Sequence, residues 1–151
     1  RWTRKDGSQM EEFEYSVIIT LTAYYRGYKV GKYFPKEKRD FLVYSLITFA
    51  IITALTFYKP VAALLLFILP MIMGLFMTAW ATYEHHAGLN TDNHFEASFN
   101  NLNRWYNMFT GNLGYHTAHH HKQGLHWSKL PQLHAQIANN IPDKLIRKTW
   151  V

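Results

Sequence analysis

Between residues 41 and 83 the chain carries one charged side chain, that of Lys59. The uncharged stretches on either side of it contain 18 and 24 residues. A soluble core helix seldom needs more than about 12–14 consecutive apolar residues, whereas a bilayer span needs about 20. The sequence therefore predicts an all-α membrane protein with a two-helix transmembrane hairpin, residues 41–58 and 61–83, joined by a tight turn at Lys59-Pro60. A soluble helical hairpin is the alternative, and the length of the stretches disfavours it.

The distribution of positive charge predicts how the hairpin is oriented. Residues 1–40 contain nine Lys or Arg and residues 83–151 contain six, against Lys59 alone at the turn. By the positive-inside rule, both ends of the chain and its histidines lie in the cytoplasm. The net charge of +6 is typical either of nucleic-acid binding or of contact with anionic lipid. Basic clusters beside apolar spans favour lipid, so we expect membrane lipid and no nucleic acid as a partner.

Helical segments are expected on both sides of the hairpin. Residues 10–25 are predicted to form a short helix, either in the membrane interface or buried in protein. Residues 26–40 read as a basic linker, because two glycines and Pro35 interrupt them. Residues 94–109 have apolar side chains at helical spacing, as do residues 133–141, which Pro142 follows. Asp6-Gly7-Ser8 predicts a turn, and Pro70 and Gly74 are the expected kink positions of the second span.

Histidine is concentrated after the hairpin, where His85 to His126 include eight of the nine in the chain. The chain has no cysteine, which excludes disulfides, iron–sulfur clusters and thiolate metal sites. His116, His119 and His120 are spaced i, i+3 and i+4, so their rings share one face of a helix. Three neighbouring imidazoles are costly to bury unpaired and repel one another when protonated, and a bound cation removes both problems. We therefore expect these three histidines to bind a metal ion.

The other histidines are less strongly constrained. His85, just past the second span, is the expected fourth ligand, and His86 competes with it because spacing alone does not choose between them. His121 points about 100° away from His120 on a helix and is a weaker candidate that faces solvent or supports the ligands. Taken singly, His94, His126 and His134 are more typical of hydrogen-bonded structural residues. Zinc, copper and iron all suit imidazole ligands, but no hydrolytic zinc motif is present.

Two stretches resemble a known family. Tyr115-His116-Thr117-Ala118-His119-His120 resembles the third histidine box of the membrane fatty acid desaturase and hydroxylase superfamily. Glu84-His85-His86-Ala87-Gly88-Leu89 looks like the E-H-x-G-L stretch of the related alkane hydroxylases, whose histidine is a ligand. The cytoplasmic boxes around a two-span hairpin are also that superfamily's layout. The sequence around the third box, from Asn112 to Tyr115 and from His126 to Pro131, is similar to bacterial members, so a bacterial inner membrane is the expected location.

The resemblance implies a non-haem di-iron site that uses dioxygen to remove hydrogen from an unactivated carbon. It implies His85, His116, His119 and His120 as metal ligands, with His86 and His121 as further candidates. Asn112 and His126 are candidates to support the ligands by hydrogen bonds. A fatty acyl lipid is the expected substrate. Two electrons from outside are needed for each dioxygen, and the chain has no cofactor motif of its own, so we expect a ferredoxin, cytochrome or reductase as electron donor.

The chain also departs from the family's pattern. The family's first two histidine boxes precede the hairpin, whereas no histidine occurs here before His85. Together with a start at Arg1 rather than Met, this predicts that residues 1–151 are the C-terminal part of a single desaturase domain, which alone is inactive and binds iron incompletely. Within it, residues 1–40 are cytoplasmic or interfacial, 41–83 form the hairpin, and 84–151 form the cytoplasmic histidine region. A hydroxylase or ketolase of the same superfamily and a membrane zinc hydrolase remain the alternative functions.

Overall fold

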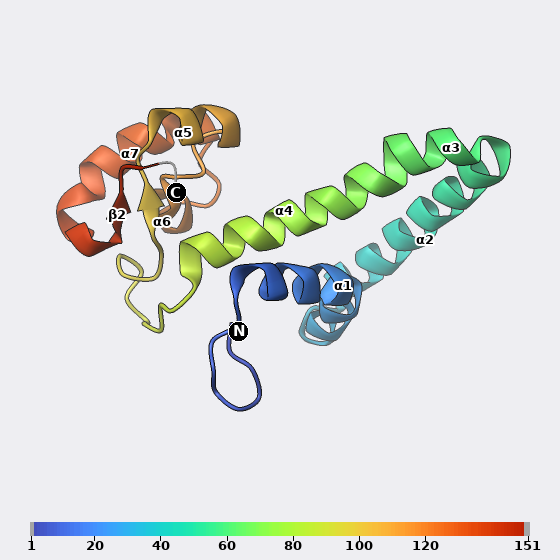
Figure 1. The fold of residues 1–151 in the computed structure, drawn as a ribbon, viewed down its shortest axis with the longest axis horizontal. Coiled ribbons are helices and arrows are strands. Elements are labelled where there is room, and N and C mark those ends of the chain that lie inside the picture. The colour runs from blue at the N-terminus through green and yellow to red at the C-terminus, as the bar shows by residue number, and fades with distance from the viewer. Residues whose placement is uncertain (1, 150–151) are drawn as a thin grey trace. The chain divides into compact units, whose positions relative to one another are not determined.

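The computed structural model describes residues 2–149, which are largely helical (Figure 1). They form two compact units. One consists of residues 10–81, and the other combines residues 2–9 with residues 82–149. Strand pairing in the described residues is confined to β1 (Asn100–Asn101) beside β2 (Ile146–Arg147) and a single bridge from Thr3 to Gln9. The predicted all-α class is confirmed.

The apolar stretches form the predicted hairpin. Its first helix is α2 (Pro35–Tyr58), and its second begins with α3 (Pro60–Ala63), passes through the π-helical turn η2 (Leu64–Ile68) and continues as α4 (Leu69–His86). Lys59 is the non-helical residue between them, with φ −146°. Both helices begin with proline, which is favoured there because a first-turn N–H has no helical partner. The π turn ends two residues before Pro70, whose ring would clash with the carbonyl four residues back in a regular α-helix.

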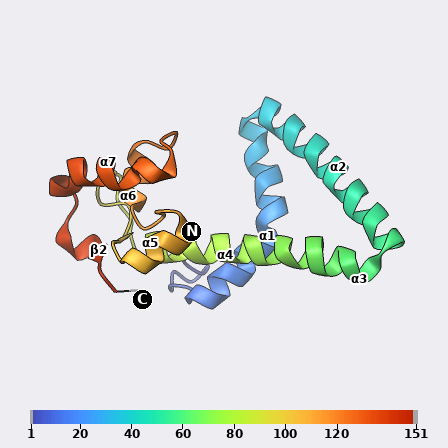
Figure 2. The same cartoon turned by 90° about the horizontal axis from the view of Figure 1, so that it is seen from above.

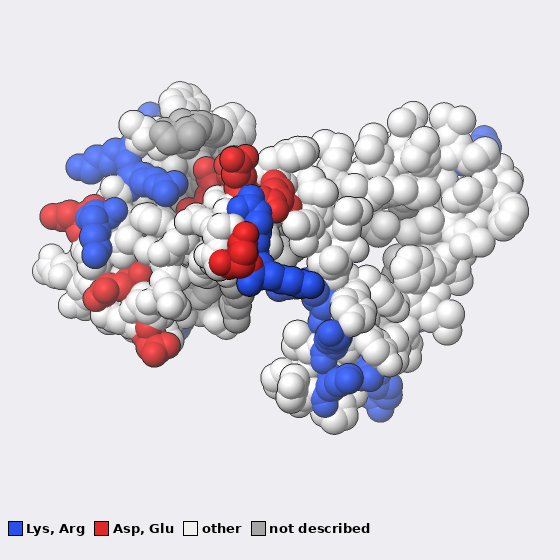
Figure 3. Space-filling view, turned by 60° about the horizontal axis from the view of Figure 1, so that its bottom comes forward, with Lys and Arg blue, Asp and Glu red and all other residues white. Residues whose placement is uncertain are grey.

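The side chains of the hairpin face outward. In the first helix, none (0%) of the most apolar stretch is buried inside the structure. In the second helix, 6% of the corresponding stretch is buried. A soluble core helix of this composition would be mostly buried, whereas a span exposes its apolar side chains to lipid. In Figure 3 the hairpin surface is almost free of charge, and Lys and Arg gather at the connection that leads into it. The hairpin therefore has the length, composition and exposure of two membrane spans.

The basic segment before the hairpin is helical rather than a linker, so that prediction was wrong. Helix α1 runs through Glu12–Val30, η1 covers Gly31–Tyr33, and α2 begins at Pro35. Gly27 lies within α1 and faces the ring of Phe41, where an added Cβ would make an ordinary contact. Tyr24 also packs on Phe41, with ring centroids 5.0 Å apart. Within this unit α1, α2 and α4 form three sides of a triangle (Figure 2).

The unit that holds the histidines is built from short elements. Its helices are α5 (Arg104–Thr110), α6 (His116–His121) and α7 (Leu130–Ile137), with 3-10 turns η3 (Trp127–Lys129), η4 (Ala138–Asn140) and η5 (Asp143–Leu145). The expected helix over residues 133–141 is thus present as α7 and η4. Its apolar face packs on α6 in a core of buried side chains: Ala118, Leu130, Ile137, Ile141 and Leu145.

The predicted helix over residues 94–109 is wrong for its first half, since only α5 is helical. Asparagine side chains compete with a helix there by hydrogen-bonding the local backbone. Asn93 Oδ1 accepts from the Phe95 N–H at 3.0 Å and begins a turn. Asn103 Oδ1 accepts from the N–H groups of Trp105 and Tyr106, so it caps α5 and sets where that helix begins.

Candidate metal centre

Helix α6 carries four of the candidate ligands (His116, His119, His120 and His121), and a side chain distant in the sequence caps it. Tyr115, at the N-cap position, makes no side-chain cap. Instead Asn100 Oδ1 accepts from the Thr117 N–H at 3.0 Å, and Asn100 Nδ2 donates to Thr117 Oγ1 at 2.7 Å. Ser98 also bonds Thr117 Oγ1, at 2.9 Å. All three side chains are at most 1% exposed, so the start of the histidine helix is fixed by a buried polar network.

The segment that enters α6 is held just as closely. Asn107 Oδ1 accepts from the Gly114 N–H at 3.1 Å, and Asn107 Nδ2 donates to the Asn101 carbonyl at 2.7 Å. A Cβ at position 114 would collide with that same Asn101 carbonyl oxygen, so only glycine fits. Asn107 and Gly114 therefore place the residues directly before His116.

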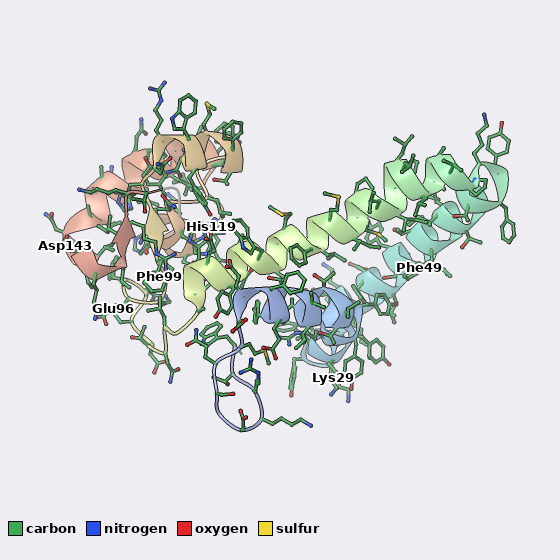
Figure 4. The ribbon with its side chains drawn as sticks, in the orientation of Figure 1. Lys29, Phe49, Glu96, Phe99, His119 and Asp143 are labelled. Carbon is green, nitrogen blue, oxygen red and sulfur yellow. The ribbon has the colours of Figure 1, made fainter. Side chains whose placement is uncertain are left out.

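The other candidate ligands lie at the end of α4. His86 Nδ1 lies 2.8 Å from the Ala97 carbonyl, and His85 Nδ1 lies 2.9 Å from the Phe99 carbonyl. A carbonyl oxygen only accepts, so in both rings Nδ1 carries the proton. The Nε2 atom of each neutral ring then carries the lone pair, which is the form in which imidazole accepts a hydrogen bond or binds a metal. Phe99 is labelled in Figure 4.

Three imidazoles from two helices converge at one point. The Nε2 atoms of His86 and His116 are 3.0 Å apart, and His120 Nε2 lies 3.2 Å from each of them. These residues could together hold a metal ion. Nitrogen atoms that share one first-row metal ion, at bonds of about 2.1 Å, are separated by distances of this size. The donor set therefore fits a metal ion bound by nitrogen.

Electrostatics also favour neutral rings in this cluster. Burial, and then the neighbouring imidazoles, lower the pKa of His116 to about 2. Burial and the charges of His86 and His119 likewise lower the pKa of His120. Neutral imidazole is the ligand form, so near neutral pH these rings need not give up a cationic proton before a metal could bind. The Nδ1 atom of His116 is buried without a hydrogen-bond partner within residues 2–149.

His85 lies beside the cluster and makes different contacts. It is 2% exposed, and its ring stacks on that of His116 with centroids 4.1 Å apart and an interplanar angle of 5°. Its Nε2 accepts from the Tyr106 hydroxyl at 3.0 Å. Burial raises the pKa of Tyr106 to about 12, so that hydroxyl remains a donor. The structure thus brings His86 into the cluster, whereas both ring nitrogens of His85 are hydrogen-bonded to protein.

The remaining candidates lie outside the three-nitrogen cluster. The ring of His119, labelled in Figure 4, is 5.8 Å from those of His116 and His120. His121 packs on Phe95 with centroids 5.7 Å apart. His126 Nδ1 accepts from the Ser128 backbone and caps η3.

Asn112 also makes its contact elsewhere, since its side chain donates to the Trp127 carbonyl at 3.2 Å. Its backbone is left-handed, with φ 64°, which fits its place in a turn. The contacts described here for Asn112 and His126 therefore tie together the loops around α6 rather than the ligands. The expected hydrogen bonds from these two residues to the ligands are not among these contacts and stay a prediction.

Sequence reasoning did not find the residues that position the cluster. Asn100, Asn107 and Tyr106 are all at most 6% exposed. The one signal in the sequence was the density of asparagine, with Asn100, Asn101, Asn103 and Asn107 lying within a segment predicted to be an amphipathic helix. Buried asparagines that each satisfy several backbone groups are hard to infer before the long-range contacts are known.

Comparison with known proteins identifies one family. The sequence model described as fatty acid desaturase matches residues 5–150. Searches among curated proteins and among solved structures gave no match.

Proposed function

Because the chain belongs to the fatty acid desaturase family, we propose that it serves the dioxygen-dependent introduction of a double bond into a fatty acyl chain. The family makes it a membrane protein of the oxidoreductase type with iron-dependent chemistry. The observation that carries the proposal is the convergence of three Nε2 atoms within 3.0–3.2 Å. Iron bound there supplies the dioxygen activation that removes hydrogen from an unactivated carbon.

In this proposal His86, His116 and His120 hold one iron. The carbonyls of Ala97 and Phe99 fix the tautomers of the two histidines on α4, and Asn100 fixes the helix that bears the other two ligands. We assign His85 to holding the His116 ring in place, because its nitrogens are already bonded. His119 remains a candidate ligand of the second iron that the family resemblance implies.

The metal assignment is tested by anaerobic titration of the purified chain with Fe²⁺ and by metal analysis. We expect close to one iron per chain. Replacing His86, His116 or His120 by Ala should weaken binding at least about tenfold. Lys144→Ala, at an exposed residue of the same unit, is the control and should leave the affinity unchanged. Tight binding of two irons, or unchanged affinity in His86→Ala, would refute the assignment.

Residues 1–151 alone are expected to be inactive, so the reaction is tested by analysing the acyl chains of cells that express a complete desaturase domain that includes them. Desaturation predicts that a double bond appears only when oxygen is supplied, and that the His86→Ala variant lacks it. A hydroxylated product would indicate the hydroxylase or ketolase alternative. Zinc in the purified protein, with product formation that is independent of oxygen, would indicate the membrane zinc hydrolase.

We further propose that electrons come from a separate ferredoxin, cytochrome or reductase at the cytoplasmic side. The support is the basic character of the histidine-bearing unit, with Lys122, Lys129, Arg147 and Lys148 all exposed. Opposite charges steer association at rates that fall with ionic strength. Turnover that depends on an acidic donor should therefore slow as salt rises, whereas iron binding to the purified chain should not follow the same dependence.

A further inference from the structure

Helix α5 presents an apolar face outward. Tyr106 and Asn107 point inward and are 2% and 6% exposed, whereas Trp105, Met108 and Phe109 are 54%, 55% and 73% exposed. The last three are spaced i, i+3 and i+4, so they lie on one side of the helix. Large apolar side chains gathered in this way mark a surface that binds something.

The charge of this part of the chain suits an anionic surface. Residues 97–142 contain no Asp or Glu, whereas Arg104, Lys122 and Lys129 lie among them. The Arg104 guanidinium lies over the Trp105 ring, 5.5 Å from its centroid. Tryptophan beside a basic residue is the pairing found where a helix lies in the headgroup layer of a membrane.

Helix α5 also follows a candidate membrane span at a short distance in the sequence. The second candidate span ends at His86, and only residues 87–103 separate it from α5. We propose that the outward face of α5, made of Trp105, Met108 and Phe109, docks in the headgroup layer of a bilayer that contains anionic lipid. The histidine-bearing unit is then held to the membrane by a surface contact as well as by the helix that leads into it. This proposal does not depend on the metal or on the reaction.

Trp105 is itself the probe. The other tryptophans (Trp2, Trp80, Trp127 and Trp150) are replaced by Phe, and the full chain is reconstituted in vesicles of phosphatidylcholine and phosphatidylglycerol. We expect Trp105 emission to be quenched about twofold by lipid brominated near the headgroup and to resist aqueous acrylamide. Quenching by bromolipid should weaken when phosphatidylglycerol is omitted.

A charge-insertion variant tests the face rather than the single ring. Met108→Asp in the Trp105-only chain should abolish most of the bromolipid quenching while the far-UV circular dichroism is retained. Gln132→Asp, at an exposed position on α7, is the matched control and should change nothing. Quenching by acrylamide but not by bromolipid would mean that the face meets water. Protection from both quenchers would mean that protein, such as a second copy of the chain, covers it. Either result overturns the proposal.

Discussion

His85 and His86 are neighbours in the sequence but have different partners. His116 and His120 could be paired from their spacing, because residues four apart share a helix face. The choice between His85 and His86 could not be predicted in that way. The choice depends on the positions of the Ala97 and Phe99 carbonyls. Both carbonyls belong to the segment before α5, where asparagine side chains hydrogen-bond the backbone.

The variant Tyr106→Phe tests whether His85 supports the His116 ring or is itself a metal ligand. Loss of the hydroxyl leaves the buried His85 Nε2 without a donor, which should cost about 1–3 kcal/mol of folding free energy. Iron affinity should change less than about threefold, far less than in His86→Ala. Thermal unfolding in detergent and iron titration measure the two effects. Tyr33→Phe, at a tyrosine that is 82% exposed, is the control. A loss of iron as large as that in His86→Ala would show that Tyr106 and His85 belong to the ligand set.

His134 should make the fold sensitive to acid. It is 6% exposed, its Nδ1 has no hydrogen-bond partner within the described part of the chain, and burial lowers its pKa below 6.5. In the unfolded chain His134 becomes protonated near pH 6.5, whereas in the folded chain it is protonated only at a lower pH. The contribution of His134 is therefore complete above about pH 6.5 and is lost as the pH falls below it.

The variant His134→Phe keeps a ring against Tyr115, whose centroid lies 5.2 Å away, and removes the titration. Its unfolding midpoint should fall less than that of the wild type between about pH 8 and pH 5. Comparison of the two proteins at about pH 8, where both are uncharged at this position, controls for the change in packing. Equal acid sensitivity would assign the effect to other groups.

At the level of elements, composition was a better guide than periodicity. The hairpin was predicted with its turn at Lys59, because a long uncharged stretch can be read without knowing its neighbours. The helix over residues 94–109 was predicted from apolar spacing and is half wrong. The asparagines of this segment hydrogen-bond backbone groups and so begin turns and cap α5. The spacing of the apolar residues does not reveal these contacts.

Gly114→Ala tests how tightly α6 is placed. The new Cβ would collide with the Asn101 carbonyl and crowd Asn107 Oδ1. We expect a loss of at least about 1–3 kcal/mol in stability, together with weaker iron binding because His116 is displaced. Gly124→Ala, with nothing within 4 Å of the added Cβ, should behave like the wild type. A stable Gly114→Ala variant with full iron affinity would mean that the loop can move away without cost.

At the scale of the whole molecule, the positive-inside rule predicts that the hairpin turn and the histidines lie on opposite sides of the membrane. The chain has no cysteine, so single substitutions give clean probes. Lys59→Cys should be labelled by an impermeant maleimide only from the outer side, and Gly124→Cys only from the cytoplasmic side. Labelling of both from the same side would exclude a spanning hairpin.

The paired carbonyls of Ala97 and Phe99 have a kinetic consequence. They hold the proton of each α4 histidine on the ring nitrogen remote from the cluster before any ion arrives. Capture of an ion at His86 then needs neither a ring flip nor a proton transfer, and little conformational entropy is lost in the step. Binding of the ion by His86 should therefore add no slow phase to metal loading, as expected of a ligand whose proton and ring orientation are set beforehand.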